Sequence, residues 1–418
     1  MIRWLFVFVA VVLVGPVRAD NWPGWRGPKG TGHCAEQNIP VRWDRQKNVQ
    51  WKIELPNGGN SSPVVWGDRI FLTQALDKKA HKRALLCLAR KDGKLFWKRV
   101  VNYKETEPTH NTNPLCSASP ITDGERVVVS FGSAGLYCYD FEGKQLWNVE
   151  LGKLHHIWGT ASSPILYKNL VILWCGPGDR QFLVAVDKRT GKQVWKYNEP
   201  GGARNRNAAG KWVGSWSTPV IANVQGRDEL LLSVPYKLKS FDPNTGKVLW
   251  HCDGLGPLVY TSPVCSQDGI VVALSGYGGP AMAVQAGGKG DVTKTHRLWR
   301  HSRKKNPQRI GTGVIVGDNY YLLSTPGVAQ CFDLKSGKDL WQQKRLSEAQ
   351  SWSSMVYADG RFYVVNTKGT CYVLKASPKY EVLAQNSINE VVRGSIAISN
   401  GDLFIRSYKH LWRIRDQR

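Results

Sequence analysis

Short apolar stretches recur along the whole chain, separated by polar turns. Each holds six or seven residues rich in Val, Ile, Leu, Tyr or Phe, as in RIFLTQ (69–74), RVVVSFG (126–132), LVILWCG (170–176) and RFYVVN (361–366). Gly, Asp and Asn bound these stretches, which is typical of short β-strands. No stretch shows a sustained period of 3.6 residues, so the pattern excludes a helical solenoid.

A turn followed by a tryptophan marks the end of each repeating unit. Three copies share Asp, Gly, Lys and Trp at the same places: DKRTGKQVWK (187–196), DPNTGKVLWH (242–251) and DLKSGKDLWQ (333–342). Aligned on the aromatic residue, the series comprises Trp51, Trp97, Trp147, Trp195, Trp250, Trp299 and Trp341, and a degenerate copy places Leu383 last. Repeats of this length indicate one supersecondary unit repeated in space.

The residues of this motif have mechanical roles. Asp187, Asp242 and Asp333 are expected to accept backbone N–H groups of a tight turn. Gly191, Gly246 and Gly337 supply the positive φ that the turn requires. The tryptophan that follows is expected to lie between neighbouring units, where it buries a large apolar surface. The motif therefore predicts structure rather than chemistry.

A second mark runs out of phase with the first and has the form small-small-Pro-aliphatic. It occurs at 60–65, 117–122, 161–166, 216–221 and 260–265, with weaker relatives at 311–316, 352–357 and 393–398. Eight marks, each opening a unit of about four strands, predict an all-β, eight-bladed β-propeller of four-stranded antiparallel blades.

The two ends of the chain are expected to close this ring. The last unit, from residue 393 onward, supplies only three strands, and the missing outer strand is available from NVQWKIELP (48–56). A blade built from both ends removes open sheet edges. The predicted organisation is a signal peptide (1–19), a lead-in segment (20–48) and the propeller (49–418).

The first twenty residues resemble an export signal. Arg3 precedes an apolar run of about eleven residues (4–14), and Val17 and Ala19 fit cleavage after Ala19. A membrane anchor is the alternative, but this run is too short to span a bilayer. The mature protein is therefore expected to be exported, periplasmic or extracellular, with no transmembrane segment.

Charge and cysteine content change this picture little. The net charge is +25, from 57 Lys and Arg against 32 Asp and Glu, but the basic residues are spread along the chain. Nucleic acid is not an expected partner of an exported chain.

Of the nine cysteines, Cys87, Cys138 and Cys331 occupy a repeat position held elsewhere by Ala or Ser, which indicates core packing. A disulfide framework is not expected, although a single disulfide stays open.

The segment AVDKRTGKQVW (185–195) resembles the docking motif of the pyrroloquinoline-quinone (PQQ)-type repeat propellers. The resemblance covers residues 50–418, and NWPGWRGPKGTG (21–32) is similar to the lead-in of exported PQQ-binding-like propellers. This superfamily includes quinoprotein dehydrogenases and the non-enzymatic BamB-like assembly factors. The resemblance implies the fold and leaves the choice between these activities open.

Candidate chemistry is sparse. Quinoprotein dehydrogenases need a Ca²⁺ ion held by carboxylates, but Glu54, Glu348 and Glu390 belong to three different blades. His155 and His156 are adjacent and would point to opposite faces of a strand, which disfavours a shared metal ion. No catalytic, cofactor-binding or metal-ligating residue is predicted; PQQ with Ca²⁺ is kept as an alternative.

Binding is the better supported prediction. The long insertions 75–83, 98–116 and 196–214 are expected on one face of the propeller. A binding rim is predicted there from His155, His156, Trp158, Trp212, Trp216, Tyr260, Arg309, Trp352 and Arg393. The competing interpretation is that these side chains fill the central channel. The leading hypothesis is a monomeric, non-catalytic, BamB-like propeller that docks a protein or envelope component; the alternatives are a quinoprotein oxidoreductase and a glycan-binding propeller.

Overall fold

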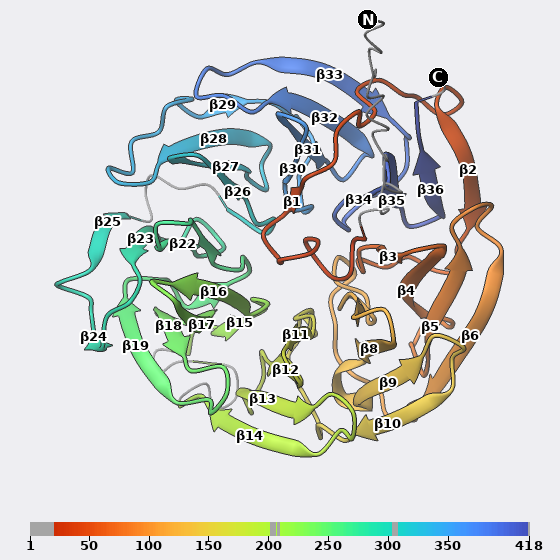
Figure 1. Ribbon diagram of the computed structural model, residues 1–418, viewed down its shortest axis with the longest axis horizontal. Helices are drawn as coiled ribbons and strands as arrows, with labels where there is room; N and C mark the ends of the chain where they lie inside the picture. Colours follow the sequence, from red (N-terminus) through yellow and green to blue (C-terminus); the bar gives the residue numbers. More distant parts are fainter. Residues whose placement is uncertain (1–20, 201–205, 207–209, 303–307, 417–418) are drawn as a thin grey trace, which may run out of the picture.

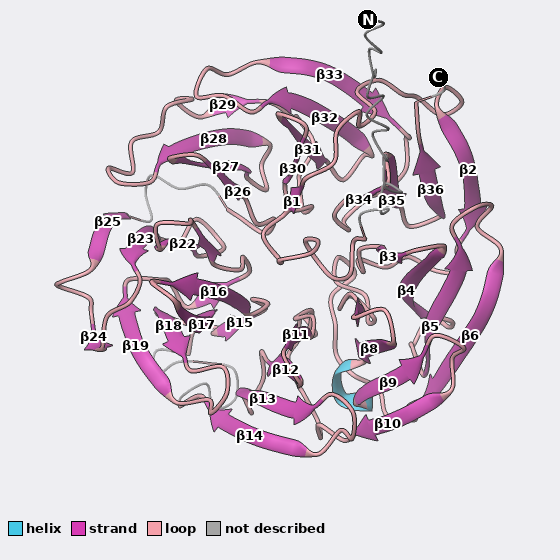
Figure 2. Ribbon diagram, in the orientation of Figure 1, coloured by secondary structure: helices cyan, strands magenta, loops and turns pink. Residues whose placement is uncertain are grey.

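The computed structural model of the chain describes residues 21–200, 206, 210–302 and 308–416. Eight β-sheets surround a common axis and form a ring (Figure 1). Within these ranges the one helix is the 3-10 turn η1 (Gly132–Ala134), so the described part of the chain holds no helix able to span a bilayer (Figure 2). The predicted eight-bladed β-propeller is confirmed. The predicted signal peptide lies outside the described residues.

Blades 1 to 4 follow each other along the chain, and in each the strand nearest the axis comes first. Blade 1 is β3 (Val64–Trp66), β4 (Arg69–Ala75), β5 (Lys82–Ala89) and β6 (Leu95–Asn102). Blade 2 is β7 (Ile121–Thr122), β8 (Arg126–Ser130), β9 (Leu136–Asp140) and β10 (Gln145–Val149). Blade 3 is β11 (Ile165–Tyr167), β12 (Leu170–Cys175), β13 (Phe182–Asp187) and β14 (Gln193–Asn198). Blade 4 is β16 (Val220–Val224), β17 (Arg227–Val234), β18 (Lys237–Phe241) and β19 (Val248–Asp253).

Blades 5 to 8 complete the ring. Blade 5 is β21 (Val264–Cys265), β22 (Ile270–Leu274), β23 (Ala281–Gln285) and β25 (Arg297–His301). Blade 6 is β26 (Val314–Val316), β27 (Asn319–Leu323), β28 (Val328–Asp333) and β29 (Lys344–Arg345). Blade 7 is β30 (Val356–Ala358), β31 (Arg361–Val365), β32 (Thr370–Lys375) and β33 (Val382–Ser387). Blade 8 is β34 (Ala397–Ser399), β35 (Asp402–Arg406), β36 (His410–Ile414) and, from the other end of the chain, β2 (Val49–Glu54).

The closure of blade 8 is as predicted. β2 pairs antiparallel with β36, with Lys52 opposite Trp412 and Glu54 opposite His410. β2 therefore lies at the circumference, in the place that β6 takes in blade 1 (Figure 1). This pairing joins segments that are more than three hundred residues apart in the chain.

The seams between blades show why the turn-and-tryptophan motif repeats. Six of the seven outer tryptophans donate their indole N–H to a carbonyl oxygen in the turn of the following blade. The pairs are Trp51 to Arg90 (3.0 Å), Trp97 to Phe141 (2.8 Å), Trp147 to Lys188 (3.0 Å), Trp195 to Pro243 (3.1 Å), Trp299 to Leu334 (2.7 Å) and Trp341 to Ser377 (3.2 Å). Trp250 differs, because its indole N–H donates to Glu229 Oε2 of its own blade at 2.7 Å. Apolar side chains of adjacent blades pack together behind these contacts, as Val128 and Leu136 do with Val171 and Leu173.

The turn residues act as expected. Asp187 Oδ1 accepts hydrogen bonds from the backbone N–H groups of Arg189 and Thr190 at 3.0 and 2.9 Å. Gly191 and Gly246 have φ of +73° and +71°, and each lies against the tryptophan of the preceding blade. The glycine therefore serves both the turn and the seam.

Four short strands depart from the predicted pattern. In blade 6 the outer strand begins at Lys344 and not at Trp341, because Gln342 and Gln343 both have positive φ. β24 (Gly290–Asp291) leaves blade 5 and pairs with β19 of blade 4. β15 (Gly214–Ser215) pairs with β20 (Leu258–Val259) in a separate two-stranded sheet.

The lead-in segment crosses the centre of the ring before it reaches β2 (Figure 1). Trp22 exchanges two backbone hydrogen bonds with Val65 of blade 1, and β1 (His33–Cys34) pairs in parallel with β30 of blade 7. Arg26 is buried and donates to the backbone carbonyls of Thr312 (3.1 Å) and Gly313 (2.6 Å) in blade 6. Burial lowers the pKa of Arg26 to about 10. The lead-in thus ties blades 1, 6 and 7 together.

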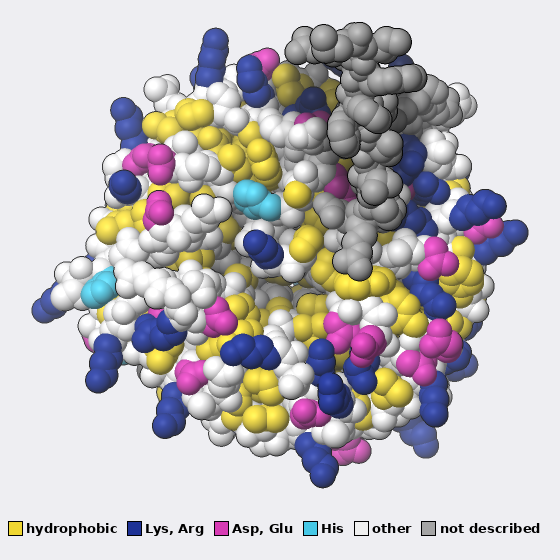
Figure 3. Space-filling model, viewed as in Figure 1, with side chains coloured by type: hydrophobic (Ala, Val, Ile, Leu, Met, Phe, Trp, Pro, Cys, Tyr) yellow, Lys and Arg dark blue, Asp and Glu magenta, His cyan; other side chains and the backbone are white. Residues whose placement is uncertain are grey.

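All nine cysteines lie in the described residues, and none forms a disulfide. Eight of them are buried, among them Cys87, Cys138 and Cys331, for which the repeat predicts a role in core packing. Lys and Arg side chains are scattered around the face seen in Figure 3 and do not gather in one patch.

Candidate binding site

The second sequence mark builds a closed ring of hydrogen bonds around the axis. In each blade, the residue two positions before the innermost strand carries a hydroxyl group, and this hydroxyl oxygen accepts the backbone N–H of the equivalent residue in the preceding blade. The eight donor–acceptor pairs are Ser62–Ser119, Ser119–Ser163, Ser163–Thr218, Thr218–Ser262, Ser262–Thr312, Thr312–Ser354, Ser354–Ser395 and Ser395–Ser62, at 2.8 to 3.1 Å. We call these eight residues the hydroxyl ring.

The hydroxyl ring corrects the alignment of one sequence mark. The sixth mark was aligned as GTGVIV (311–316), with Gly313 in the place of the hydroxyl residue. The ring passes through Thr312, so Gly313 stands where most other copies have proline. The first place of the sixth mark, which Trp216 and Tyr260 hold in blades 4 and 5, is therefore Ile310 and not Gly311.

The residues two positions before the ring hydroxyls line a cavity at the axis. There is one from each blade, and we call them the wall positions: Asn60, Ser117, Ala161, Trp216, Tyr260, Ile310, Trp352 and Arg393. The cavity has a volume of about 360 Å³, within the range that holds small molecules in proteins. Six members of the hydroxyl ring line it, together with Trp25 of the lead-in and several loop residues, which are His110, Thr112, Asn113, Trp158, Tyr277, Gln308, Thr325 and Gln350.

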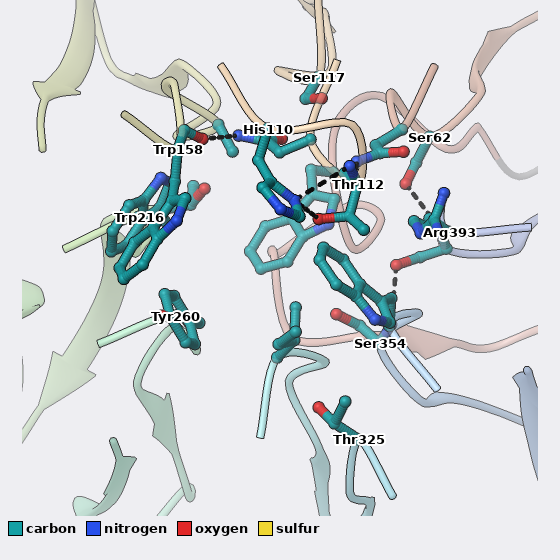
Figure 4. Close-up of a pocket in the computed structure, with 18 of the residues that line it drawn as sticks. Ser62, His110, Thr112, Ser117, Trp158, Trp216, Tyr260, Thr325, Ser354 and Arg393 are labelled. Atoms are coloured by element: carbon teal, nitrogen blue, oxygen red, sulfur yellow. Dashed lines mark hydrogen bonds between the residues drawn. The ribbon is translucent and has the colours of Figure 1, made fainter. Parts of the chain in front are cut away.

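Aromatic rings form one side of this cavity. Trp216 contacts Tyr260 with ring centroids 4.9 Å apart, and Trp158 and Tyr277 complete the cluster at centroid distances of 5.6 to 5.9 Å. Trp158, Trp216 and Tyr260 lie together on one side in Figure 4. Burial raises the pKa of Tyr260, so its phenol stays protonated.

A cation lies across the cavity from the aromatic cluster (Figure 4). The Arg393 guanidinium lies 5.3 Å from the centroid of Trp352 and 5.0 Å from that of Tyr408, and its Nη1 donates to the Tyr408 hydroxyl at 2.6 Å. Such contacts hold a guanidinium in place without neutralising its charge. Arg393 is the one Lys or Arg among the described residues that line the cavity.

Five predicted rim residues line the cavity: Trp158, Trp216, Tyr260, Trp352 and Arg393. His156 is fully buried behind Trp158 and Trp216, with ring centroids 5.3 and 5.0 Å away, and Trp212 contacts it at 5.4 Å. Burial lowers the pKa of His156 to about 4. His155 is exposed and does not line the cavity.

Arg309 does not form part of a binding rim, contrary to the prediction. Its side chain is fully buried, and Nη2 donates to Gln330 Oε1 at 3.0 Å inside blade 6. Burial lowers its pKa to about 10. The wall position of blade 6 is the next residue, Ile310, which stands two positions before the ring hydroxyl of Thr312.

Sequence reasoning missed other lining residues. Trp25, Tyr277 and Thr325 come from segments outside the marks, and no local pattern distinguishes them. The wall positions can be identified from the sequence. Each stands two residues before a position of the repeat that is Ser or Thr in all eight copies. Aligning the eight marks on that hydroxyl identifies all eight.

The residues present do not fit a calcium site of the quinoprotein type. No carboxylate is among the described residues that line the cavity, and no group of three His, Cys, Asp or Glu side chains in the described ranges could hold a metal ion. Glu54 and Glu348 are exposed. The Glu390 carboxylate is held by Ser407 Oγ and by His410 Nδ1, the latter at 2.8 Å. The aromatic rings and Arg393 would suit the flat shape and negative charge of a quinone cofactor, but they supply no ligand for its calcium ion.

Comparison with known proteins identifies one family, and the similar proteins include both assembly factors and dehydrogenases. The model of the family described as outer membrane protein assembly factor BamB matches residues 37–234, 81–343 and 325–417. BamB of Burkholderia pseudomallei (strain K96243) is 24% identical over 318 residues, which cover 64% of this chain and 74% of that protein. The polyvinylalcohol dehydrogenase of Sphingopyxis sp. (strain 113P3) is 26% identical over 267 residues, covering 56% of this chain but only 39% of the enzyme. The structure of BamB from Moraxella catarrhalis has a TM-score of 0.61 at 16% identity, with 88% of this chain and 97% of that one covered.

Proposed function

Because this chain belongs to the BamB family of PQQ-like propellers, we propose that it is a non-catalytic binding module of the cell envelope. It is exported and docks a protein or another envelope component on the face of the propeller that contains the axial cavity. One observation carries the proposal. The cavity offers aromatic rings, amides, hydroxyls and an arginine, but its described lining has no carboxylate to act as a base or metal ligand.

The composition of this face suits binding. Tryptophan, tyrosine and arginine are the residues that most often dominate the energy of an interface. Trp216, Tyr260, Trp352 and Arg393 occupy four of the eight wall positions. The net charge of +25 adds a long-range attraction for anionic partners, which raises association rates at low ionic strength.

The test is capture of partners from an envelope extract by the immobilised protein. Trp352→Ala is compared with Phe96→Ala, since Phe96 is an exposed aromatic residue on the outer strand of blade 1. We expect Trp352→Ala to weaken capture at both low and high salt, because a packed aromatic residue controls dissociation. We expect Phe96→Ala to capture like the wild type. Equal capture by all three proteins would contradict docking on this face.

Arg393→Gln separates the charge from the packing at the same place. A rim charge acts mainly on association and its salt dependence. Arg393→Gln should therefore weaken capture of an anionic partner chiefly at low salt. A loss of equal size at both salt concentrations would indicate that Arg393 acts through packing.

A quinoprotein oxidoreductase is the second candidate, because a polyvinylalcohol dehydrogenase is among the relatives. Its test is reconstitution of the purified protein with PQQ and Ca²⁺, followed by dye reduction with alcohols. We expect no reduction above that of PQQ and Ca²⁺ alone. A rate that requires the protein, PQQ and Ca²⁺ together would replace the non-catalytic proposal.

A further inference from the structure

The axial cavity has an excess of hydrogen-bond donors. Each hydroxyl of the ring uses its oxygen to accept a backbone N–H, and among the described residues none of these eight hydroxyls donates to a protein acceptor. Six of these residues line the cavity, and their hydroxyl protons are therefore available to whatever occupies it. A hydroxyl group has one donor and two acceptor positions. Accepting a backbone N–H occupies one acceptor position and leaves the O–H donor unpaired.

Two further donors in the cavity lack protein partners in the described structure. Thr325 Oγ1 is buried and has no hydrogen-bond partner, although Thr325 lines the cavity. Arg393 Nε is likewise buried without a partner. Leaving a buried polar group unpaired costs stability, and such groups in native proteins are usually satisfied by water or a ligand.

The shape of the donor arrangement limits the occupant. Ring hydroxyls from six of the eight blades line the cavity. Trp158, Trp216 and Tyr260 lie on one side, with Arg393 across from them (Figure 4). Tyr277 contacts Trp158 and Tyr260, and the Trp352 ring lies beside Arg393. A fitting ligand has oxygen acceptors around its whole edge, one flat face rich in C–H groups, and a negative charge.

From these three properties we propose that the axial cavity binds an acidic saccharide, with a uronic acid ring as its unit. The C–H face of the sugar ring packs on the aromatic cluster, its ring and hydroxyl oxygens accept from the hydroxyl ring and Thr325, and its carboxylate pairs with Arg393. Asn60, Asn113, Gln308 and Gln350 supply amide groups that accept from the sugar hydroxyls. The proposal rests on the proposed binding function of this face but does not require a protein partner.

A saccharide fits these donors better than a flat aromatic acid does. An aromatic acid places its oxygens at a few points of its edge, so most of the hydroxyl ring would stay unpaired. A sugar ring carries an oxygen on nearly every carbon. The cationic lining without carboxylates also disfavours amines and other cationic ligands.

The experiment is titration of the full-length mature protein with trigalacturonic acid, with galactotriose as the neutral probe, by calorimetry and tryptophan fluorescence. We expect trigalacturonic acid to bind roughly tenfold or more tightly than galactotriose, as is typical when a charged hydrogen bond is added. Equal affinity for the two probes, or no binding of either, would overturn the proposal.

Three variants test the assigned contacts. Arg393→Gln should reduce the affinity for trigalacturonic acid to that for galactotriose, whereas the control Arg189→Gln, on an exposed outer turn, should change neither. Tyr277 is 49% exposed, and Tyr277→Ala should reduce the affinity for both probes by a similar factor. Thr325→Val should keep the thermal stability of the free protein and still weaken binding, because the hydroxyl has no protein partner to lose. A Thr325→Val protein that binds like the wild type would contradict the placement of the sugar.

The outcome can be separated from that of the proposed function. If neither saccharide binds while capture of envelope partners still depends on Trp352, the cavity proposal fails and the binding module stands. If PQQ binds and trigalacturonic acid does not displace it, the saccharide proposal is overturned and the quinoprotein candidate gains support.

Discussion

Two glycines with similar backbone conformations differ only in what surrounds them. Gly246 has φ of +71°, and a Cβ added there would lie 2.5 Å from Trp195 Cε3; Gly226 has φ of +84° and no atom within 4 Å of such a Cβ. Gly226→Ala should cost about 1–2 kcal/mol, the strain of a left-handed alanine. Gly246→Ala should cost clearly more, because Trp195 must also shift. Urea unfolding measures both, and equal losses would mean that the seam tolerates the added methyl group.

Thr218 links three blades through the hydroxyl ring. Its Oγ1 accepts the backbone N–H of Ser163 at 3.1 Å, and its own N–H donates to Ser262 Oγ at 2.8 Å. Thr218→Val keeps the shape but leaves the Ser163 N–H without an acceptor, which should cost about 1–3 kcal/mol. Thr218→Ser keeps the acceptor and should cost much less. A Thr218→Val protein as stable as Thr218→Ser in the same unfolding assay would show that the ring hydrogen bond contributes nothing.

His156 should make stability depend on pH. Its pKa is lowered to about 4 in the folded protein, mainly by burial, from an ordinary value near 6.5. The unfolded chain therefore binds the proton more readily than the folded protein between pH 6.5 and 4. The contribution of neutral His156 is complete above pH 6.5 and is lost as the pH falls toward 4.

This dependence can be isolated by comparing thermal unfolding of two variants from pH 7 to 4. His156→Asn keeps an acceptor for the Trp158 N–H, which His156 Nδ1 provides at 3.2 Å, and should flatten the profile below pH 6.5. His155→Asn, at the exposed neighbour, should leave the profile as it is in the wild type. Identical profiles for all three proteins would exclude His156 as the source.

At the scale of elements, β2 and the lead-in are expected to be essential for a soluble ring. Removal of residues 20–55 deletes β2 and exposes the edge of β36, which pairs with it from Val49 to Glu54. It also removes Arg26 from the carbonyls of Thr312 and Gly313. An uncovered edge strand promotes aggregation, so the truncated protein should aggregate on light scattering. A soluble monomer with an unchanged melting temperature would contradict closure by β2.

The elements that sequence predicted well are those fixed by local chemistry. The turns around Asp187 and Gly191 and the seam at Trp195 depend on residues within one motif, and the structure has them as expected. The outer strand of blade 6 was misplaced because two left-handed glutamines follow Trp341, and nothing in a Trp-Gln-Gln sequence signals that conformation. The added strand β24 depends on contact with another blade, which a local pattern cannot contain.

At the scale of the whole molecule, the ring was predictable and the cavity was only partly so. Each wall position comes from a different blade, so the cavity exists only after all eight blades have closed. The sixth mark lacks the proline of the stronger copies, and the wall position there is Ile310 and not the buried Arg309 of the predicted rim. Trp25 enters the cavity only because the lead-in crosses the axis, which no repeat alignment predicts.

The hydroxyl ring also bears on how such a chain can grow. Every repeat brings one N–H donor and one hydroxyl acceptor, and all eight hydrogen bonds run in the same direction around the axis. A duplicated or deleted repeat would therefore leave no donor or acceptor unmatched at the centre. The wall positions carry no such requirement, and each is free to diverge on its own. Gene duplication can thus change the number of blades without new compatibility mutations at the axis, while ligand preference evolves one blade at a time.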